Sequence, residues 1–308
     1  MRCFITGVSG FIGFATAKQL ITHGHEVTGL TSSKSHFDPL KAAGIKPVLG
    51  DMRHPHEWID AAHSAEAVIH LATLPLPSRP GMRYVKRLLT AQELILTAML
   101  DTVSDSFKSF VCTSAVSIYG FGSDEKTEET PISPYRIAQP FALCEKLVQR
   151  AVKDKGLPGM ILRLGGVYGN GGVFGKFWTE PMLKGKRAGI PGNGKQLFSF
   201  VHIDDCVQAF VRCVEDPIPG GVFNIVDNDP APVGKVIQSL ANEMKSPRPF
   251  HIPSFMFRLA AGPLVSELLL NDKVANNKKM VGQLGVKLKY PTYREGIPAL
   301  ARTLRNYA

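Results

Sequence analysis

The sequence lacks a long hydrophobic run. No uninterrupted apolar stretch approaches the ~20 residues that a membrane-spanning helix requires. The chain begins MRCFITGVSGFIG, so glycines at turn spacing stand where a signal peptide would have its apolar segment and cleavage site. This start predicts a strand close to the N-terminus, a cytoplasmic protein and no membrane partner.

Cysteine is scarce as well. The five cysteines are an odd number, and they fall within apolar strand-like or helical patterns. Such cysteines are typical of buried free thiols in a reducing compartment. No Cys–His spacing resembles a metal site, so the sequence predicts no metal.

Positive charge exceeds negative charge without gathering into a tract. The chain has 36 Lys and Arg against 26 Asp and Glu, which gives a formal charge of +10. The short basic clusters are not interleaved with stacking aromatics, so we expect no nucleic-acid partner. A basic surface that attracts phosphorylated or carboxylated small molecules explains the excess.

Apolar strand patterns alternate with helical patterns through the first two thirds of the chain. Parallel strands joined by right-handed crossovers give this order. The near-continuous apolar character of the strands indicates a sheet covered on both faces. We therefore predict an α/β fold, a doubly wound parallel sheet of the Rossmann type. The predicted strands are Arg2–Thr6, Glu26–Leu30, Pro47–Leu49, Ala67–Leu71, Ser109–Thr113 and Gly159–Leu164, and the predicted helices are Ala15–Thr22, Leu88–Leu100 and Ala142–Lys153.

The pattern loosens after Leu164. A glycine-rich stretch is followed by a helix at Ile203–Glu215 and a strand at Val222–Val226 that returns to the sheet. The order predicts a smaller, discontinuous C-terminal substrate-binding lid over the carboxyl edge of the sheet. We expect the dinucleotide-binding domain at residues 1–165 and 197–227, and the lid at residues 166–196 and 228–308.

The most specific motif lies directly after the first predicted strand and opens a helix. It reads Thr6-Gly7-Val8-Ser9-Gly10-Phe11-Ile12-Gly13. Gly7 allows a tight turn, Gly10 lets the backbone approach a pyrophosphate, and Gly13 lets the helix pack close to the strand. The unpaired N–H groups at the start of the helix attract phosphate. The motif predicts a dinucleotide site.

The motif resembles the extended short-chain dehydrogenase/reductases, the family of NAD-dependent epimerases and dehydratases. Further segments match in the right order over roughly residues 1–230. They are Gly50-Asp51-Met52, His70-Leu71-Ala72-Thr73, the stretch VCTSAVSIYG at 111–120, LRLGGVYG at 162–169 and FVHIDD at 200–205. The resemblance implies a nicotinamide cofactor, with Asp51 and Met52 near its adenine and Leu71, Ala72 and Thr73 beside its ribose.

The end of the second strand bears on the choice of cofactor. An NAD site places a carboxylate there to hold the ribose 2′-hydroxyl. This chain has Thr31, Ser32, Ser33 and Lys34 instead, and hydroxyls with an ammonium suit a 2′-phosphate better. We therefore predict NADP(H), with NAD(H) as the alternative.

The catalytic residues that the resemblance implies are incomplete. The family uses a Ser or Thr, and a Tyr followed four residues later by Lys, to exchange a proton with the substrate oxygen. Counting back from Tyr119, the serine position holds Ala115, so Thr113 and Ser114 are the substitutes. The alternative interpretation is that Thr113 and Ser114 are only polar residues at the end of a strand.

The Tyr–Lys pair has two registers in this chain. The segment Ser133-Pro134-Tyr135 makes Tyr135 the candidate, with Gln139 at the lysine position. Alignment on Glu145, which resembles the family's helix glutamate, puts Ile137 and Phe141 at the two positions instead. Neither register supplies a lysine, so the chain is an atypical member. Tyr135 is either catalytic or a pocket residue.

Several residues are candidates for the substrate side, and a packing role is the other interpretation of each. His70 is predicted to be a satisfied core histidine. Arg163 resembles an arginine of the family, and a salt bridge within the sheet edge is its other interpretation. The predicted substrate-binding residues are Leu74, Leu76, Tyr135, Gly165, Phe174 and Trp178.

These features predict an NADP(H)-dependent oxidoreductase. It would transfer hydride to or from a carbonyl or alcohol of a small, hydrophobic metabolite. Two alternatives stay open: a non-redox isomerase, dehydratase or cyclase on the same fold, and a protein that senses NADP(H) without turning it over. Relatives often dimerise through the helices that correspond to Leu88–Leu100 and Ala142–Lys153, so a homodimer is a candidate assembly. Arg83, Lys86 and Arg87 would be exposed beside that face.

Overall fold

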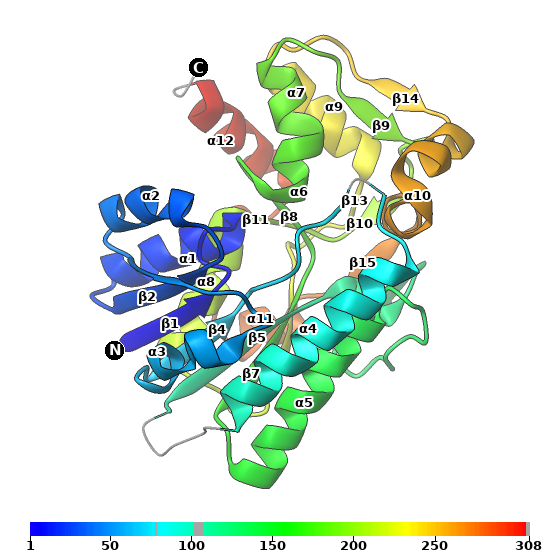
Figure 1. The fold of residues 1–308 in the computed structure, drawn as a ribbon. Helices are drawn as coiled ribbons and strands as arrows, with labels where there is room; N and C mark the ends of the chain where they lie inside the picture. Colours follow the sequence, from blue (N-terminus) through cyan, green and yellow to red (C-terminus); the bar gives the residue numbers. More distant parts are fainter. Residues whose placement is uncertain (78, 102–106, 306–308) are drawn as a thin grey trace.

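Seven parallel strands form the central sheet of the computed structural model, which describes residues 1–77, 79–101 and 107–305 (Figure 1). The strand order is β12-β7-β5-β4-β1-β2-β3. The chain therefore reverses its direction of travel across the sheet between β1 and β4, the point where α/β sheets open a ligand crevice. The strands are β1 (Arg2–Thr6), β2 (Glu26–Thr31), β3 (Lys46–Leu49), β4 (Ala67–His70), β5 (Ser109–Ala115), β7 (Gly159–Leu164) and β12 (Val222–Ile225).

Helices cover both faces of this sheet. α1 (Phe11–Thr22) packs beside α8 (Ile203–Glu215) on one face, and α4 (Met82–Leu100) beside α5 (Gln139–Lys155) on the other (Figure 1). Successive strand residues enter different cores, since Cys3 and Ile5 pack with α1 and α8 while Phe4 packs with α4. Shorter helices α2 (Phe37–Ala42) and α3 (Ile59–His63) complete the connections. The predicted doubly wound fold is confirmed.

The lid is built from two stretches that are separate in sequence. Trp178 and Ile190 from the first share a buried core with Ile237 and Leu300 from the second. The predicted discontinuous arrangement is therefore confirmed. Its helices are α6 (Gly172–Phe174), a π-helical turn (Gly175–Thr179), α7 (Glu180–Leu183), α9 (Val233–Glu243), α10 (Ser254–Leu270) and α12 (Tyr293–Arg305).

One C-terminal segment departs from the predicted domain limits. Met280, Leu284 and Val286 pack in the same core as β1 and α8, although residues 228–308 were all expected in the lid. This segment includes α11 (Lys278–Gly282), which contacts β12. Apolar side chains on a short helix bury themselves against the larger core, so this part of the chain returns to the central sheet.

Short strands join the sheet domain to the lid, and the sequence patterns did not predict them. β8 pairs in parallel with β11, and β9 with β14. These strands are two to five residues long, too short for a readable hydrophobic period. They are β6 (Gly122–Lys126), β8 (Gly166–Tyr168), β9 (Gly189–Pro191), β10 (Leu197–Phe198), β11 (Phe200–His202), β13 (Ala231–Pro232), β14 (Phe250–Ile252) and β15 (Lys273–Ala275); 3-10 turns lie at Lys34–His36, Pro55–Glu57 and Val116–Tyr119.

Three features of the described residues bear on membrane spanning, metal binding and disulfide pairing. Within residues 1–77, 79–101 and 107–305, no helix is long and apolar enough to cross a membrane. The same part of the chain holds no group of three or more His, Cys, Asp and Glu placed to bind a metal ion. All five cysteines are free and buried, as the sequence predicted.

Candidate dinucleotide-binding site

The glycine loop connects β1 to α1 in the conformation that its residue types predict. Gly7 has a φ of +74°, and a Cβ there would lie 3.0 Å from the backbone of Ala72. A Cβ at Gly13 would lie 2.3 Å from the carbonyl oxygen of Gly7, so only glycine lets α1 approach the loop this closely. Gly10 precedes the first helical residue and no side chain caps the helix start, which leaves its N–H groups for a ligand.

A buried hydrogen-bond network fixes the loop that follows β4. The Oγ1 atom of Thr6 accepts hydrogen bonds from the backbone N–H groups of Leu71 and Ala72, each at 3.1 Å. Its own proton points at His70 Nδ1 (2.8 Å), and His70 Nε2 donates to Gln92 Oε1 (2.7 Å). Gln92 in turn donates to the Ala72 carbonyl at 3.0 Å. Burial lowers the pKa of His70 to about 4, so its ring is neutral and holds one tautomer.

His70 is therefore a satisfied core histidine, as the sequence indicated. Every polar atom in this network has a partner, which makes the wall of the crevice rigid where a cofactor would lie.

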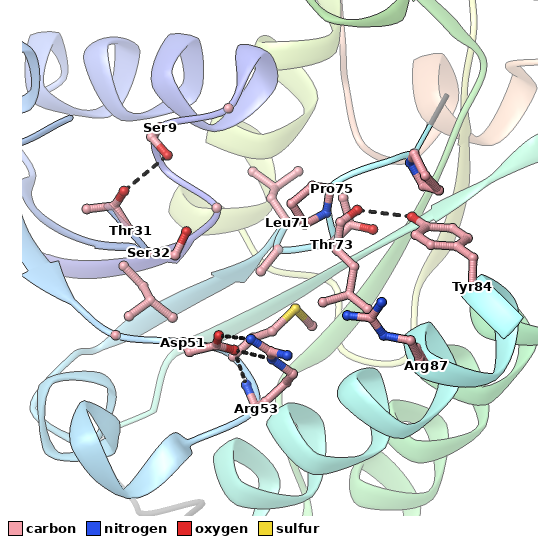
Figure 2. A pocket seen from close by; sticks show the side chains of 18 of the residues that line it. Ser9, Thr31, Ser32, Asp51, Arg53, Leu71, Thr73, Pro75, Tyr84 and Arg87 are labelled. Carbon is pink, nitrogen blue, oxygen red and sulfur yellow. Dashed lines mark hydrogen bonds and ion pairs between the residues drawn. The ribbon is translucent and has the colours of Figure 1, made fainter. Parts of the chain in front are cut away.

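The glycine loop opens onto a cavity of about 700 Å³. Four segments that are distant in sequence meet there: the loop itself and the residues that follow β2, β3 and β4 (Figure 2). Of the predicted cofactor-binding residues, Gly7, Ser9, Gly10, Thr31, Ser32, Asp51, Met52, Leu71, Ala72 and Thr73 line the cavity.

The remaining predicted cofactor residues lie outside the cavity lining. Phe11, Ile12 and Gly13 form the first turn of α1. The ring of Phe11 packs against the glycines of the β8–α6 connection, since a Cβ at Gly171 would lie 2.6 Å from it. Ser33 accepts a hydrogen bond from the N–H of Ser35, and Lys34 is exposed.

The cavity wall that follows β3 is held by an ion pair. Arg53 Nε donates to Asp51 Oδ1 at 2.9 Å, and a second guanidinium nitrogen meets the other carboxylate oxygen. These hydrogen bonds from Arg53 lower the pKa of Asp51 to about 2. On the β2 side, Thr31 donates to the Ser9 hydroxyl at 3.3 Å, which links the two strand ends.

Three further arginines line the cavity from the β4–α4 connection and the start of α4, namely Arg79, Arg83 and Arg87. In the described part of the chain no ion pair or hydrogen bond engages their guanidinium groups. Figure 2 shows Arg87 pointing into the same space as the Asp51–Arg53 pair. Asp51 is the one carboxylate among the described lining residues, so the cavity is strongly cationic.

These arginines were not among the predicted site residues; Arg83 and Arg87 had been placed beside a dimer face. Arg83 and Arg87 are four residues apart and lie on one side of α4, whereas Arg79 precedes the helix.

A nicotinamide dinucleotide fits this set of residues. The uncapped start of α1 suits the pyrophosphate, and the cationic wall suits further phosphate charge. The close approach of Gly7 to Ala72 leaves no room for a side chain where the phosphates would pass.

The ends of β5 and β7, by contrast, carry polar side chains that face the protein interior. The hydroxyls of Thr113 and Ser114 are buried, and neither has a hydrogen-bond partner among the described residues. Neither residue lines the cavity. A substrate oxygen would reach either hydroxyl only after a local opening of the surrounding chain.

Tyr135 lies in the loop before α5. Its side chain is 49% exposed, and its ring packs against Phe121 with centroids 5.5 Å apart. Ile137 and Phe141, the residues of the second register, are apolar, and Phe141 packs against a small cluster that contains Tyr119. Neither register brings a lysine to this edge.

A buried ion pair lies beneath these residues. Arg163 donates to both carboxylate oxygens of Glu145, at 2.9 and 2.7 Å, and to the hydroxyl of Tyr119 at 2.7 Å. Tyr119 donates to Asn224 Oδ1 at 2.6 Å. Burial raises the pKa of Tyr119 to about 12, so this hydroxyl keeps its proton. Of the two interpretations of Arg163, the structure shows the salt bridge.

The predicted substrate-binding residues are dispersed. Leu74 lines the cavity, whereas Leu76 is exposed outside its lining. Phe174 and Trp178 pack in the lid core, where Trp178 Nε1 donates to the Gly189 carbonyl at 3.0 Å. A Cβ at Gly165 would lie 2.5 Å from the Ser199 carbonyl oxygen, so this glycine serves close backbone packing.

The doubly wound sheet, the glycine loop and the cavity at the switch point define a Rossmann-type dinucleotide-binding protein. Residues 3–226 match the model of the NAD dependent epimerase/dehydratase family. The chain belongs to this family, the extended short-chain dehydrogenase/reductases.

Curated relatives match most of the chain. An epimerase family protein, the chloroplastic SDR39U1 homolog of Arabidopsis thaliana, is 25% identical over 97% of this chain and 86% of its own length. A 3-diazoavenalumate denitrifying reductase of Streptomyces is 25% identical over 96% of this chain and 99% of its own.

Solved structures share the whole fold. Human epimerase family protein SDR39U1 with NADPH has a TM-score of 0.81 at 21% identity, covering 98% of this chain and 99% of that one. UDP-glucuronic acid 4-epimerase from Bacillus cereus has a TM-score of 0.83 at 20% identity, with both chains covered completely.

Proposed function

We propose that the protein is an NADP(H)-dependent oxidoreductase that acts on a carbonyl or alcohol of a small, hydrophobic metabolite. The observation that carries the proposal is the cationic cavity at the glycine loop. It offers Thr31 and Ser32 at the end of β2, where an NAD site would have a carboxylate. The human relative solved with NADPH and the Streptomyces relative named as a reductase support it.

The residues of this chain would bind and orient the cofactor. The first turn of α1 would hold the pyrophosphate, and the Thr31–Ser32 hydroxyls with Lys34 nearby would hold the 2′-phosphate. The Thr6–His70–Gln92 network would keep Leu71 to Thr73 in place along the cofactor. When bound, the nicotinamide supplies the hydride.

Proton transfer is the step for which this chain departs from its family. Tyr135 carries the exposed hydroxyl of the three candidates, so it is the proposed donor to a substrate oxygen during reduction. A tyrosine that lacks the family's neighbouring lysine is a poor general base at neutral pH, which favours reduction over oxidation. Thr113 and Ser114 would steady the oxygen if the strand end opens.

A second candidate function follows from the same departure. In the alignment on Glu145, the apolar residues Ile137 and Phe141 occupy the positions of the family's Tyr and Lys. Their lack of a proton-transferring group favours a non-redox isomerase, dehydratase or cyclase, or a protein that senses NADP(H). We expect a small-molecule ligand and no nucleic acid in each case, and a homodimer through α4 and α5 remains a candidate assembly.

Titration of the protein with NADPH and NADH, followed by fluorescence, tests the proposal. We expect NADPH to bind at least tenfold more tightly than NADH. NADPH oxidation with a panel of hydrophobic aldehydes and ketones then tests the reaction, and Tyr135→Phe should lower turnover without changing NADPH affinity. Tight binding with no turnover would favour the sensor. Binding of neither dinucleotide would overturn the proposal.

A further inference from the structure

One border of the lid combines exposed apolar side chains with an excess of positive charge. β9 and β14 pair in parallel, so the chain segments around Gly189–Pro191 and Phe250–Ile252 are neighbours in space. Figure 1 shows β9, β14 and α10 along a border of the lid on the opposite side from α12. We call this surface, residues 183–187 and 248–259, the lid border.

The apolar side chains of the lid border are exposed to an unusual degree. Phe255 is 67% exposed, Leu259 68% and Met256 50%, all on the first two turns of α10. Phe257 is the one buried residue of that helical segment from Ser254 to Ala260. Phe250 on β14 adds another exposed ring. A monomer rarely leaves such side chains in water together unless they contact a partner.

The charge of the same surface has one sign. Residues 183–187 and 248–259 contain no Asp or Glu, while they hold Lys184, Lys186, Arg187, Arg248 and Arg258. Outside this set, Glu267 lines a hollow together with Arg258. The guanidinium of Arg187 lies over the Phe250 ring, 5.4 Å from its centroid, and its Nε donates to the Arg248 carbonyl. Cationic and apolar groups are therefore interleaved, not separated.

These observations limit the kinds of partner that could bind the lid border. A second copy of the lid border would place lysines and arginines against one another, so self-association through this face is disfavoured. A helix start that presents Phe, Met and Leu above a cationic surface is typical of segments that lie in the interface of an anionic lipid layer. We propose that the lid border docks the protein reversibly onto anionic membrane surfaces.

This docking differs from spanning a membrane, and it replaces the sequence-based expectation of no membrane partner. That expectation rested on the absence of a long apolar run, whereas surface docking needs a short projecting helix and basic neighbours. The anionic headgroups would meet the lysines and arginines, and Phe255 and Leu259 would enter the boundary between headgroups and acyl chains.

Vesicle sedimentation of the full-length protein tests the proposal. The vesicles are pure phosphatidylcholine and an equimolar mixture of phosphatidylcholine and phosphatidylglycerol. We expect binding to the mixed vesicles, at least tenfold weaker binding to the neutral ones, and release as salt is raised. No sedimentation with either vesicle, or equal sedimentation with both, would overturn it.

Two surface variants locate the contact. Phe255→Ser with Leu259→Ser should weaken binding to the mixed vesicles about tenfold, since it removes two inserted apolar side chains. Lys184→Gln, Lys186→Gln and Arg258→Gln together should weaken it at least as much.

The controls place one apolar and three lysine substitutions elsewhere on the surface. They are Leu94→Ser, at an exposed leucine of α4, and Lys18→Gln with Lys41→Gln and Lys46→Gln on the α1–β3 side. Controls that lose as much binding as the lid variants would overturn the assignment of this surface. NADPH titration and thermal unfolding verify that each variant is folded.

Discussion

The carboxyl edge of the sheet has two halves, and they treat polar side chains in opposite ways. At β1 to β4, the residues that follow each strand face an open cavity, and buried hydrogen bonds behind them hold their backbone in place. At β5 and β7, Arg163, Glu145 and Tyr119 satisfy one another inside the protein, and the Thr113 and Ser114 hydroxyls are buried. One half is arranged for a ligand and the other for packing.

This difference separates binding from chemistry. The residues that line the β1–β4 half fit a dinucleotide, whereas neither register of the Tyr–Lys pair supplies a lysine. A change on the β5–β7 half should therefore affect stability first, and a change on the β1–β4 half should affect affinity first.

The largest effect is expected at Arg163. Arg163→Gln would leave the Glu145 carboxylate buried without its partner, which costs about 3–5 kcal/mol of unfolding free energy. Urea denaturation measures the loss, and NADPH affinity of the folded variant should stay unchanged.

An exposed ion pair on α5, the helix that carries Glu145, is the control for this change. Arg150 meets Asp154 at 3.2 Å in solvent, so Arg150→Gln should cost less than about 1 kcal/mol. Equal losses in the two variants would contradict the internal role of the Arg163 network.

Gly7 is expected to give the largest effect on affinity. In Gly7→Ala the new Cβ would meet the Ala72 backbone at 3.0 Å and strain a residue at φ +74°. We expect NADPH affinity to fall about a hundredfold, because both walls of the phosphate path would move. Fluorescence titration measures the change.

A variant at Gly24 distinguishes the effect of backbone strain from the effect of a residue's place in the glycine loop. It has a similar φ of +82°, but a Cβ there would meet no atom within 4 Å. Gly24→Ala should therefore lower stability by about 1 kcal/mol and leave NADPH affinity intact. Should both alanine variants bind NADPH normally, the glycine loop would not form the phosphate site.

The β1–β4 half was largely readable from the sequence, and the β5–β7 half was not. The glycine loop has steric requirements that only one residue type meets, so Gly7, Gly10 and Gly13 predicted the local backbone. The orientation of Thr113 and Ser114 depends on which face of β5 is covered, and a strand buried on both sides carries no alternation that would tell. The sequence did not predict that Arg79, Arg83 and Arg87 line the cavity. Their place there depends on where α4 packs relative to the end of β3, which is a contact between distant parts of the chain.

Asp227 lies at the end of β12, next to the lid, and introduces a pH dependence. Burial raises its pKa from 3.8 to about 8, and one of its carboxylate oxygens has no partner among the described residues. Below pH 4 the carboxyl is protonated in folded and unfolded chains alike. Between about pH 4 and pH 8 the unfolded chain releases the proton while the folded chain keeps it, so this group lowers stability as pH rises.

Asp227→Asn removes that penalty. We expect it to stabilise the protein by about 2 kcal/mol at pH 9 and to change little at pH 4, as measured by urea denaturation. Asp38→Asn, at an exposed aspartate of α2, is the control and should show no such pH dependence. A stability difference that is the same at both pH values would argue against a raised pKa in Asp227.

The smallest effect is expected at Lys34, and it refines the assignment of the 2′-phosphate within the β1–β4 half. Lys34 is exposed and lies outside the cavity lining, whereas Thr31 and Ser32 line it. Lys34→Gln should therefore weaken NADPH binding only about twofold to fivefold, because an exposed ion pair is screened by water and salt. NADH binding should not change, and raising the salt concentration should erase the difference between variant and wild type.

A loss of tenfold or more that persists at high salt would mean that Lys34 moves into the cavity and contacts the phosphate directly. No loss at all would leave the hydroxyls of Thr31 and Ser32, with the arginines of the opposite wall, as the source of the preference for NADPH.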